Sequence, residues 1–417
     1  MSESKKLIPK RRFKGFEDTG KWQTNKLSVM AEFSKGNGYS KNDLREYGIP
    51  IILYGRLYTK YETIIKSVDT FVDQKINSAV FSTGVEVVVP ASGETSEDIA
   101  RASFIEQSAL IIGGDLNILK PKTQLNSVFL ALSLSNGNQR KELIKRAQGK
   151  TVVHIHNSDL KEVNLIFPIK NEQIKIGEFF KKLDHLITTQ QKKLQKAKTL
   201  KLAYLTEMFP NEGELKPRYR FLGFKKDWSI TQFKNLANIR RGLTYTPSNL
   251  VLNGVRILRS SNIDSDKFIL RDDDIFIDQS YVSISLVKEN DILITSANGS
   301  SRLVGKHALI KITNNEKAVH GGFMLLATSN QPFFTNAIMS SDWYRKFLNT
   351  YVAGGNGAIG NLNKSELANQ YISIPITLEQ TKIGNFFKLL DDKIALEQKK
   401  LNKLKNIKQA YLNEMFV

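Results

Sequence analysis

The sequence of 417 residues contains no cysteine, which excludes disulfides and thiolate-ligated metal sites. It also has no run approaching the roughly 20 apolar residues that cross a bilayer. Its first twelve residues, MSESKKLIPKRR, are polar and basic and do not have the apolar segment of a signal peptide. Together these absences predict a soluble protein of the reducing cytoplasm that does not act in a membrane.

Catalytic motifs are scarce as well. We find no Ser-His-Asp or Cys-His arrangement, no (Asp/Asn)-Pro-Pro-(Tyr/Phe) run typical of amino-methyltransferases, and no convincing cluster of nuclease carboxylates. His154 and His156 would share one face of a strand, but a third ligand at a suitable spacing is missing. We therefore expect this chain to hold no catalytic residue, no metal and no cofactor.

Positive charge is in excess. Lysine and arginine number 61 against 41 acidic residues, which gives a net charge of +20 and a pI near 9.7. The excess is spread along the chain and is not concentrated in a tail. Such a surplus favours a polyanionic partner, with nucleic acid the first candidate and an anionic membrane surface the second.

One stretch occurs twice, at residues 168–209 and 375–416, with an offset of 207 and no gap. Both copies lack proline after their first residue and are rich in helix formers. A single copy would be an ordinary amphipathic surface helix, but apolar residues recur at heptad spacing in both copies, and two such stripes can bury each other around a two-fold axis. We predict an antiparallel coiled coil with these interface residues: Phe180, Leu183, Ile187, Leu194, Phe387, Leu390, Ile394 and Leu401.

The regions before the two helices also correspond. Trp22 matches Trp228, Gly36 matches Gly242, and the pair Gly113-Gly114 stands opposite Gly321-Gly322. Between these anchors the two halves share little, so one scaffold carries two different surfaces. The predicted boundaries are 1–168 for the first globular region, 169–209 for its helix, 210–217 for a linker, 218–375 for the second globular region and 376–417 for its helix.

Short strands dominate the globular regions. β-rich runs at 48–58, 85–90, 254–263 and 291–296 are bounded by turn-prone residues. Residues 129–147 and 342–352 have helical character. The expected fold is α+β, with two strand-rich domains in tandem, each followed by a long helix.

Two segments imitate nucleotide-binding loops. Gly149-Lys150-Thr151 resembles the end of a phosphate-binding loop, and residues 355–360 (GNGAIG) fit the GxGxxG pattern. The first lacks the required earlier glycine, where Ile144 stands, and the second follows a helical stretch. Because the two segments occupy the same position of the repeat, we interpret them as a turn that tolerates glycine.

Loops rich in Gly, Asn, Ser, Thr, Tyr and basic residues recur at matching places in both halves. Any one of them is ordinarily a solvated turn, but together in a strongly basic chain they suit DNA, because Arg reads guanine, Asn reads adenine and hydroxyls hold phosphates. The candidate DNA-binding residues are Lys35, Tyr39, Lys41, Tyr54, Arg56, Ser92 and Lys150 in the first half, and Arg240, Arg241, Thr244, Tyr245, Arg259, Ser261, Asn262, Asn298, Ser301, Arg302 and Asn356 in the second.

Over its whole length the chain resembles the specificity (S) subunits of type I restriction-modification enzymes. The resemblance is carried by the Pro-x-x-x-Glu-Gln-x-x-Ile openings at 168–176 and 375–383, by the duplicated helices, and by the Phe-x-Gly-Phe starts at 13–16 and 221–224. It implies that each globular region is a target-recognition domain that reads one part of a bipartite sequence in double-stranded DNA. It also implies a helical spacer that binds two methyltransferase (M) subunits.

The resemblance further implies motor-nuclease (R) subunits as partners. S-adenosylmethionine, ATP and magnesium would belong to those partner subunits, and this chain would be non-catalytic. An alternative from another class is a coiled-coil adaptor that binds protein or structured RNA, which predicts no sequence preference on duplex DNA. A self-contained enzyme would need a catalytic constellation that the sequence does not display.

Overall fold

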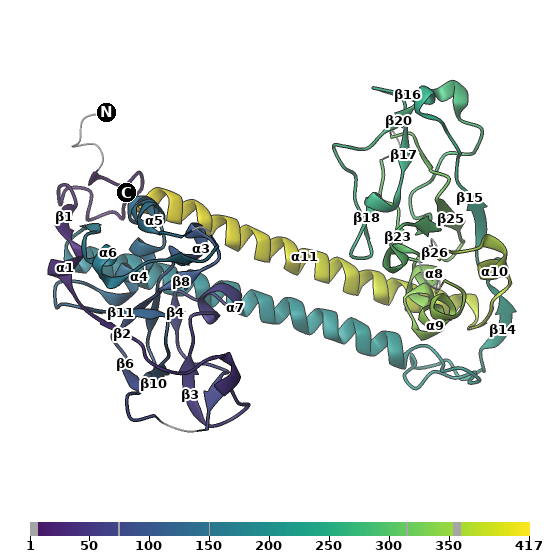
Figure 1. Ribbon diagram of the computed structural model, residues 1–417. Coiled ribbons are helices and arrows are strands. Elements are labelled where there is room, and N and C mark those ends of the chain that lie inside the picture. The colour runs from purple at the N-terminus through teal and green to yellow at the C-terminus, as the bar shows by residue number, and fades with distance from the viewer. Residues whose placement is uncertain (1–6, 74–75, 150, 314–315, 353–359) are drawn as a thin grey trace. The chain divides into compact units, whose positions relative to one another are not determined.

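The computed structural model in Figure 1 describes residues 7–73, 76–149, 151–313, 316–352 and 360–417. The chain divides into two compact units, Met1–Gln191 with Lys399–Val417, and Lys192–Gln398. Two long helices, α7 (Lys170–Glu207) and α11 (Thr377–Met415), each begin in one unit and end in the other. Each unit therefore combines one globular region with the start of one long helix and the end of the other.

The first unit contains two main sheets. One has the strand order β2-β11-β7-β9-β4 and the other β5-β3-β10-β6, while β1 pairs with β13 and β8 with β12. The strands are β1 (Gln23–Lys26), β2 (Ala31–Lys35), β3 (Ile49–Ile52), β4 (Ile64–Ile65), β5 (Phe71–Val72), β6 (Val80–Thr83), β7 (Val87–Pro90), β8 (Ser92–Gly93), β9 (Ser103–Ile105), β10 (Ser108–Ile112), β11 (Leu116–Pro121), β12 (Val153–His154) and β13 (Asn164–Phe167). The shorter helices are α1 (Leu27–Met30), η2 (Lys41–Asp43), α2 (Arg56–Thr59), α3 (Ser96–Ile99), α4 (Ser127–Leu134), α5 (Gly137–Arg146) and α6 (Asn157–Lys161).

The second unit repeats this plan with sheets ordered β15-β25-β21-β23 and β16-β20-β17-β24, and with the pairs β14-β27, β18-β19 and β22-β26. Its strands are β14 (Ser229–Gln232), β15 (Asn238–Arg241), β16 (Leu250–Val251), β17 (Val255–Leu258), β18 (Ile263–Asp264), β19 (Lys267–Phe268), β20 (Phe276–Ile277), β21 (Ile292–Thr295), β22 (Ala297–Asn298), β23 (His307–Leu309), β24 (Ala318–His320), β25 (Met324–Thr328), β26 (Gly360–Asn361) and β27 (Tyr371–Ile374). Its shorter helices are η3 (Phe233–Asn235), η4 (Pro247–Asn249), η5 (Ser260–Asn262), η6 (Gln279–Tyr281), η7 (Ser301–Leu303), α8 (Pro332–Met339), α9 (Asp342–Tyr351) and α10 (Lys364–Asn369).

The predicted α+β repeat is confirmed, and both units share an unusual feature. In each, the second sheet contains a parallel pair: β3 with β10 at the centre of the sheet in the first unit, and β17 with the edge strand β24 in the second. A parallel pair needs a crossover connection between its strands. That crossover places the loops after both strands at the same edge of the sheet.

Several elements differ in length from the sequence prediction. The β-rich run at 254–263 ends at Leu258, because the Asn262 side chain accepts a hydrogen bond from the Arg259 backbone N–H at 2.7 Å and closes the turn η5. The run at 48–58 likewise ends at Ile52 and continues into α2. The helical stretch 129–147 is two helices, with Gly137 at φ +61° just beyond the break.

The long helices pair antiparallel inside each unit, as predicted. In the first unit the Phe179 ring near the start of α7 lies 4.9 Å from the Tyr411 ring near the end of α11. In the second unit Phe386 and Tyr204 make the same contact with the helices exchanged, again at 4.9 Å. The apolar stripe is buried at Phe180, Leu183, Leu194, Phe387, Leu390, Ile394 and Leu401, and half-buried at Ile187.

The end of each long helix enters the core of a globular region. Phe416 packs against Phe129 and Phe180, with ring centroids 5.9 and 6.0 Å apart, in the main core of the first unit. The terminal carbonyl of Val417 accepts a hydrogen bond from Asn138 N–H at 2.7 Å. Phe209, the repeat counterpart of Phe416, lies in the main core of the second unit.

Candidate nucleic-acid interface

The repeated Pro-x-x-x-Glu-Gln motif attaches the start of α7 to the first globular region. Two N–H groups of Arg12 donate to the Glu172 carboxylate at 2.7 and 2.6 Å, and the Glu172 side chain is 1% exposed. The hydrogen bond to Glu172 raises the pKa of Arg12 above its ordinary value. The Gln173 side-chain amide donates to the Pro168 carbonyl at 2.9 Å, which holds the chain where it enters the helix.

The second copy of the motif makes the same contacts. Arg220 donates twice to the buried Glu379 carboxylate, both times at 2.7 Å, and Gln380 donates to the Pro375 carbonyl at 2.8 Å. A bidentate arginine–carboxylate pair fixes orientation as well as distance. Each globular region is therefore held in one orientation on the helix that follows it in the sequence.

Four loops converge at one edge of the sheets in the first unit. We call residues 35–41, 53–58, 91–94 and 113–115 the first loop platform. Backbone hydrogen bonds of 2.8–2.9 Å join its loops, from Gly113 N to Ile52 O, Gly114 N to Gly38 O, and Ala91 N to Asp115 O. These bonds connect segments that lie far apart in the sequence.

The equivalent loops of the second unit form the second loop platform, which comprises residues 240–246, 259–262, 296–302 and 320–323. Its connecting hydrogen bonds run from Leu243 N to His320 O at 2.8 Å, Gly321 N to Leu258 O at 2.9 Å, and Ser296 N to Phe323 O at 2.9 Å. In addition, the Asn298 side chain donates to the Ser260 hydroxyl at 3.0 Å. Both units thus assemble the same set of loops on the same strands.

A close backbone approach explains two of the matched glycines. A Cβ atom at Gly36 would lie 2.0 Å from the carbonyl oxygen of Gly113, and a Cβ at Gly242 would lie 1.9 Å from that of Gly321. Any side chain at Gly36 or Gly242 would push the first loop of the platform away from its glycine-pair turn. These two positions therefore require glycine for the platform to close.

The candidates of the first platform fall into two groups. Lys35, Lys41 and Tyr54 are exposed. Tyr39 accepts a hydrogen bond from the Ile76 N–H at 2.9 Å, and the Ser92 hydroxyl lies 3.2 Å from His154 Nδ1. The exposed group is thus available for contact, while the other two hydroxyls have protein partners.

Arg56 has a different environment from the one its sequence position suggested. Its side chain is only 8% exposed and forms ion pairs with Glu62, at 2.8 Å, and with Asp69. Its partners come from the segment after α2, which the sequence pattern did not connect to it. The arginine holds this loop in place, and we leave it out of the proposed contact surface.

In the second platform Arg241, Thr244, Ser301 and Arg302 are exposed. Arg240 is half-buried and lies 3.6 Å from the Asp291 carboxylate. Tyr245 and Asn298 are also half-buried at the same edge. These candidates come from two separate stretches of the sequence, 240–245 and 298–302.

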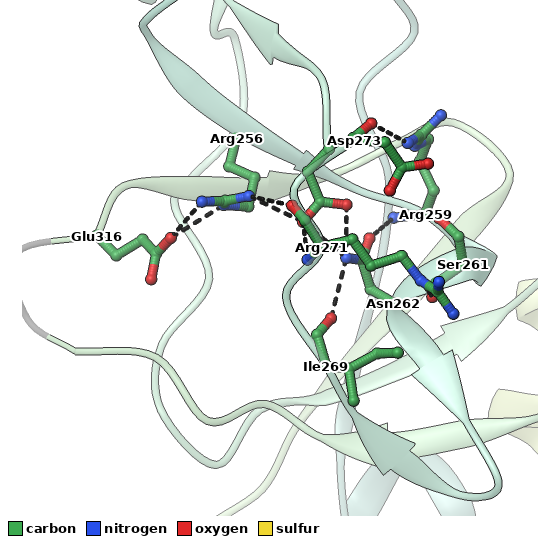
Figure 2. A network of polar contacts seen from close by, with 9 residues as sticks. Arg256, Arg259, Ser261, Asn262, Ile269, Arg271, Asp273 and Glu316 are labelled. Carbon is green, nitrogen blue, oxygen red and sulfur yellow. Dashed lines mark hydrogen bonds and ion pairs between the residues drawn. The ribbon is translucent and has the colours of Figure 1, made fainter. Parts of the chain in front are cut away.

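A polar network supports the loop after β17 (Figure 2). At its centre the buried Asp274 carboxylate accepts hydrogen bonds from Arg256, at 2.8 Å, and from the Asn262 side chain, at 2.8 and 3.0 Å. Arg256 also pairs with Glu316 at 2.7 Å. Asn262 is fully buried and donates to the Ile269 carbonyl as well, so its amide fixes the loop and we leave it out of the contact surface.

The same network leaves polar atoms at the platform edge. Arg259 donates to the Asp273 carbonyl at 3.1 Å, and Arg271 donates to the Ser261 carbonyl at 2.6 Å (Figure 2). Within the described part of the chain, the Nε of Arg259 and the hydroxyl of Ser261 are buried without a hydrogen-bond partner.

Two predicted contacts, Lys150 and Asn356, lie outside the described residues, as does most of the GNGAIG segment. Gly149 itself has φ +133°, and its neighbour Gln148 bridges to His154. The positive φ of Gly149 agrees with the predicted turn in the first copy, and the prediction for the second copy stays untested.

Sequence reasoning overlooked two residues of the second platform. Phe323 follows the glycine pair directly and is 75% exposed. His320 precedes the pair and is fully buried, and this burial lowers its pKa to about 4. The signal that could have found both is their position beside the matched glycine pair, where the other half carries Ile112 and Asp115.

Over the described residues, no helix is long and apolar enough to cross a membrane. The same residues hold no cluster of three or more His, Cys, Asp or Glu side chains suited to a metal ion. The rings of His154 and His156 stack with their centroids 6.3 Å apart.

Comparison with known proteins gives consistent results. A family model described as the type I restriction modification DNA specificity domain matches twice, at residues 19–199 and 225–406. Two curated relatives are each 21% identical: the type I restriction enzyme MjaVIII specificity subunit of Methanocaldococcus jannaschii, over 70% of each chain, and the EcoKI specificity subunit of Escherichia coli K12, over 95% of this chain and 88% of that one.

Solved structures show the same fold. The S subunit of a type I restriction-modification system from M. genitalium is 15% identical, covers 99% of both chains and has a TM-score of 0.65. A structure reported for complex assembly and conformational transition of the type I R-M system is 14% identical, covers 94% of this chain and 96% of that one, and has a TM-score of 0.52. With two specificity domains that together match most of its length, this chain belongs to the family of type I restriction-modification DNA specificity subunits.

Proposed function

We propose that each globular region reads one part of a bipartite DNA target through its loop platform. The observation that carries this proposal is the construction of the same platform twice, on matched strands and matched glycines, with different exposed side chains on each. An unchanged scaffold with changed loops is what two readers of unlike half-sites need. The family to which the chain belongs supports DNA as the ligand.

The exposed basic and hydroxyl side chains of the platforms would make the contacts. In the second platform Arg241 and Arg302 supply positive charge, and Thr244 and Ser301 supply hydroxyls. Arginine and hydroxyl groups position a protein on phosphates, and arginine also reads guanine in the major groove.

The paired helices would set the distance between the two half-sites. A helix of 38 residues such as α7 is about 57 Å long at 1.5 Å per residue. One turn of duplex DNA spans about 34–36 Å, so helices of this length suffice to separate two readers by at least a turn. In this proposal the number of unread base pairs depends on helix length and not on the platforms.

The outer faces of the same helices would bind two methyltransferase subunits, and motor-nuclease subunits would join that complex. Exposed leucines remain on these faces after the helices have paired, among them Leu186 on α7 and Leu389 and Leu396 on α11. Apolar side chains exposed beside a buried stripe favour a protein partner. We place the catalysis, and with it S-adenosylmethionine, ATP and magnesium, on the partner subunits.

The experiment replaces basic residues of the second platform one at a time. The full-length chain, co-expressed with its methyltransferase subunits, is purified with Arg241→Ala, Arg302→Ala or the control Lys346→Ala. Lys346 lies on α9, outside the platform, and its side chain is 62% exposed. Binding is measured at several salt concentrations on a duplex that carries the target mapped from methylation in cells.

Loss of one phosphate contact lowers the slope of log affinity against log salt by about 0.9. We expect this lower slope and weaker binding for at least one platform arginine, and no change for the control. Binding equal to that of the unaltered chain in both platform variants, or equal binding to unrelated duplexes by the unaltered complex, would contradict the proposal.

A further inference from the structure

Phe323 is a large apolar side chain in an environment that otherwise favours polar groups. It is 75% exposed and occupies the turn between β24 and β25, which is one of the four loops of the second platform. The exposed residues of the neighbouring loops include Arg241, Thr244 and Arg302. Leaving an aromatic ring in water gives up the free energy that its burial would provide, so the folded chain by itself gives this position no reason to be phenylalanine.

The backbone that carries the ring is fixed from several sides. The Phe323 carbonyl accepts hydrogen bonds from Ser296 N–H at 2.9 Å and from Ala297 N–H at 3.1 Å. Next to it, Met324 N–H donates to the Gly321 carbonyl at 2.8 Å. Because the backbone of this turn is already fixed, a later contact of the ring has to order only its two side-chain torsions, which keeps the entropy cost small.

The scaffold does not require an aromatic residue at this place. In the first platform the same turn carries Asp115, which is exposed and whose carbonyl accepts the equivalent hydrogen bond from Ala91 N–H at 2.8 Å. At this turn position the residue contributes its backbone carbonyl to the hydrogen bonds that join the platform loops, and its side chain takes no part in them. The side chain is therefore free to differ between the two halves, and in the second half it is a phenylalanine.

We propose that Phe323 inserts its ring into the base stack of the half-site that the second globular region reads. Apolar side chains that enter a base step separate the neighbouring bases, and an aromatic ring can stack on any base because every base has a π-face. The surrounding arginines would hold the phosphates on either side of the step. This inference rests on the proposed function, because it requires the second platform to lie on duplex DNA.

The inference also distinguishes the two halves. Asp115 at the equivalent turn carries a carboxylate, which the phosphates repel and which cannot stack. The first platform would therefore read an undistorted half-site, and the second would locally open its own.

The test uses the full-length chain with its co-expressed methyltransferase subunits and a duplex that carries the mapped target. 2-Aminopurine replaces one base at a time in each half-site, and its fluorescence reports local loss of stacking. The methylated bases are left unlabelled, because methyltransferases turn their target base out of the stack and would brighten it in either half-site. At the other positions we expect one in the second half-site to brighten on binding of the unaltered chain and none in the first. Phe323→Ala should abolish that signal and weaken binding by about 5- to 150-fold, the range for the loss of one base–aromatic stack.

Two further variants sharpen the outcome. Phe323→Trp should keep the signal, because a larger aromatic ring still stacks, whereas Phe323→Asp, which imports the residue of the first platform, should lose it. Leu252→Ala is the matched control, since Leu252 is 94% exposed but precedes β17, at the opposite end of that strand from the platform. This control should leave both binding and fluorescence unchanged.

Unchanged binding and fluorescence in Phe323→Ala would overturn the inference. If Arg241→Ala or Arg302→Ala still weakened binding in that case, the proposed reading of DNA by the second platform would stand without the insertion. If neither arginine variant had an effect, the proposed function of the platform would fail together with the insertion.

Discussion

Lys201 on α7 lies with its Nζ 2.6 Å from the Oδ1 of Asp391 on α11. The same pair recurs with the helices exchanged, between Lys408 on α11 and Asp184 on α7, at 2.5 Å. Both lysines interrupt the apolar stripe. At the repeat offset of 207 the two lysines are counterparts of each other, and so are the two aspartates. The same lysine–aspartate ion pair thus fixes the register of the antiparallel helices in each unit.

Reversing one of these charges should weaken the helix pairing, and reversing both should restore it. Lys201→Glu places two carboxylates together, which we expect to cost about 1 kcal/mol of the free energy of unfolding for a pair this exposed. The double variant Lys201→Glu with Asp391→Lys recovers an ion pair. Urea unfolding midpoints of the three chains measure the effect, and a double variant no more stable than Lys201→Glu would argue against a specific pair.

Phe416, which directly follows α11, should stabilise the first globular region at the other end of the sequence. Phe416 is 5% exposed and packs against rings of α4 and α7, so Phe416→Ala should lower the free energy of unfolding by about 3–5 kcal/mol. Leu222→Ala, at a side chain that is 97% exposed, should stay within about 0.5 kcal/mol. Limited proteolysis followed by mass spectrometry would show whether the loss is confined to the first unit. Equal stability of the two variants would contradict this packing.

Much of the fold could be predicted because its signals are local or repeated. The heptad stripe and the absence of proline indicate the helices, and duplication indicates that they pair. The exposure of Arg56 and Asn262 could not be predicted, because their partners Asp69 and Asp274 lie 13 and 12 residues away across turns whose geometry the sequence does not reveal. Phe323 was overlooked because a single aromatic residue after two glycines looks like any other apolar residue of a loop.

Acidification should destabilise the folded chain through the buried His320. Burial lowers its folded pKa to about 4, against 6.5 for an ordinary histidine. Between these two pH values the unfolded chain binds a proton that the folded chain does not, so this histidine's contribution is present above pH 6.5 and is lost as the pH falls towards 4. From pH 7.5 to pH 5 the loss is about 2 kcal/mol.

His320→Gln removes this proton uptake, so its loss of stability between pH 7.5 and pH 5 should be smaller by about 2 kcal/mol than that of the unaltered chain. His154→Asn is the matched control, because His154 is exposed and its repeat counterpart is Asn361. Urea unfolding at the two pH values provides the measurement. Parallel pH dependences for His320→Gln and the unaltered chain would show that the histidine does not couple folding to protonation.

If the platforms read the half-sites and the helices set the distance between them, lengthening the helices should change that distance alone. Seven residues inserted between Gln191 and Lys192, and seven more between Gln398 and Lys399, extend both helices where the chain passes from one compact unit to the other. One heptad adds about 10 Å to each helix and preserves the apolar stripe. That length corresponds to about three base pairs of duplex DNA.

Long-read methylation mapping in cells that express the chain with its partner subunits tests the central claim most directly. The complex that contains the unaltered chain should methylate a bipartite target, and the complex with the lengthened chain should methylate the same two half-sites with about three more unread base pairs between them. A continuous target for the unaltered chain, or altered half-sites at an unchanged spacing for the lengthened one, would contradict the account.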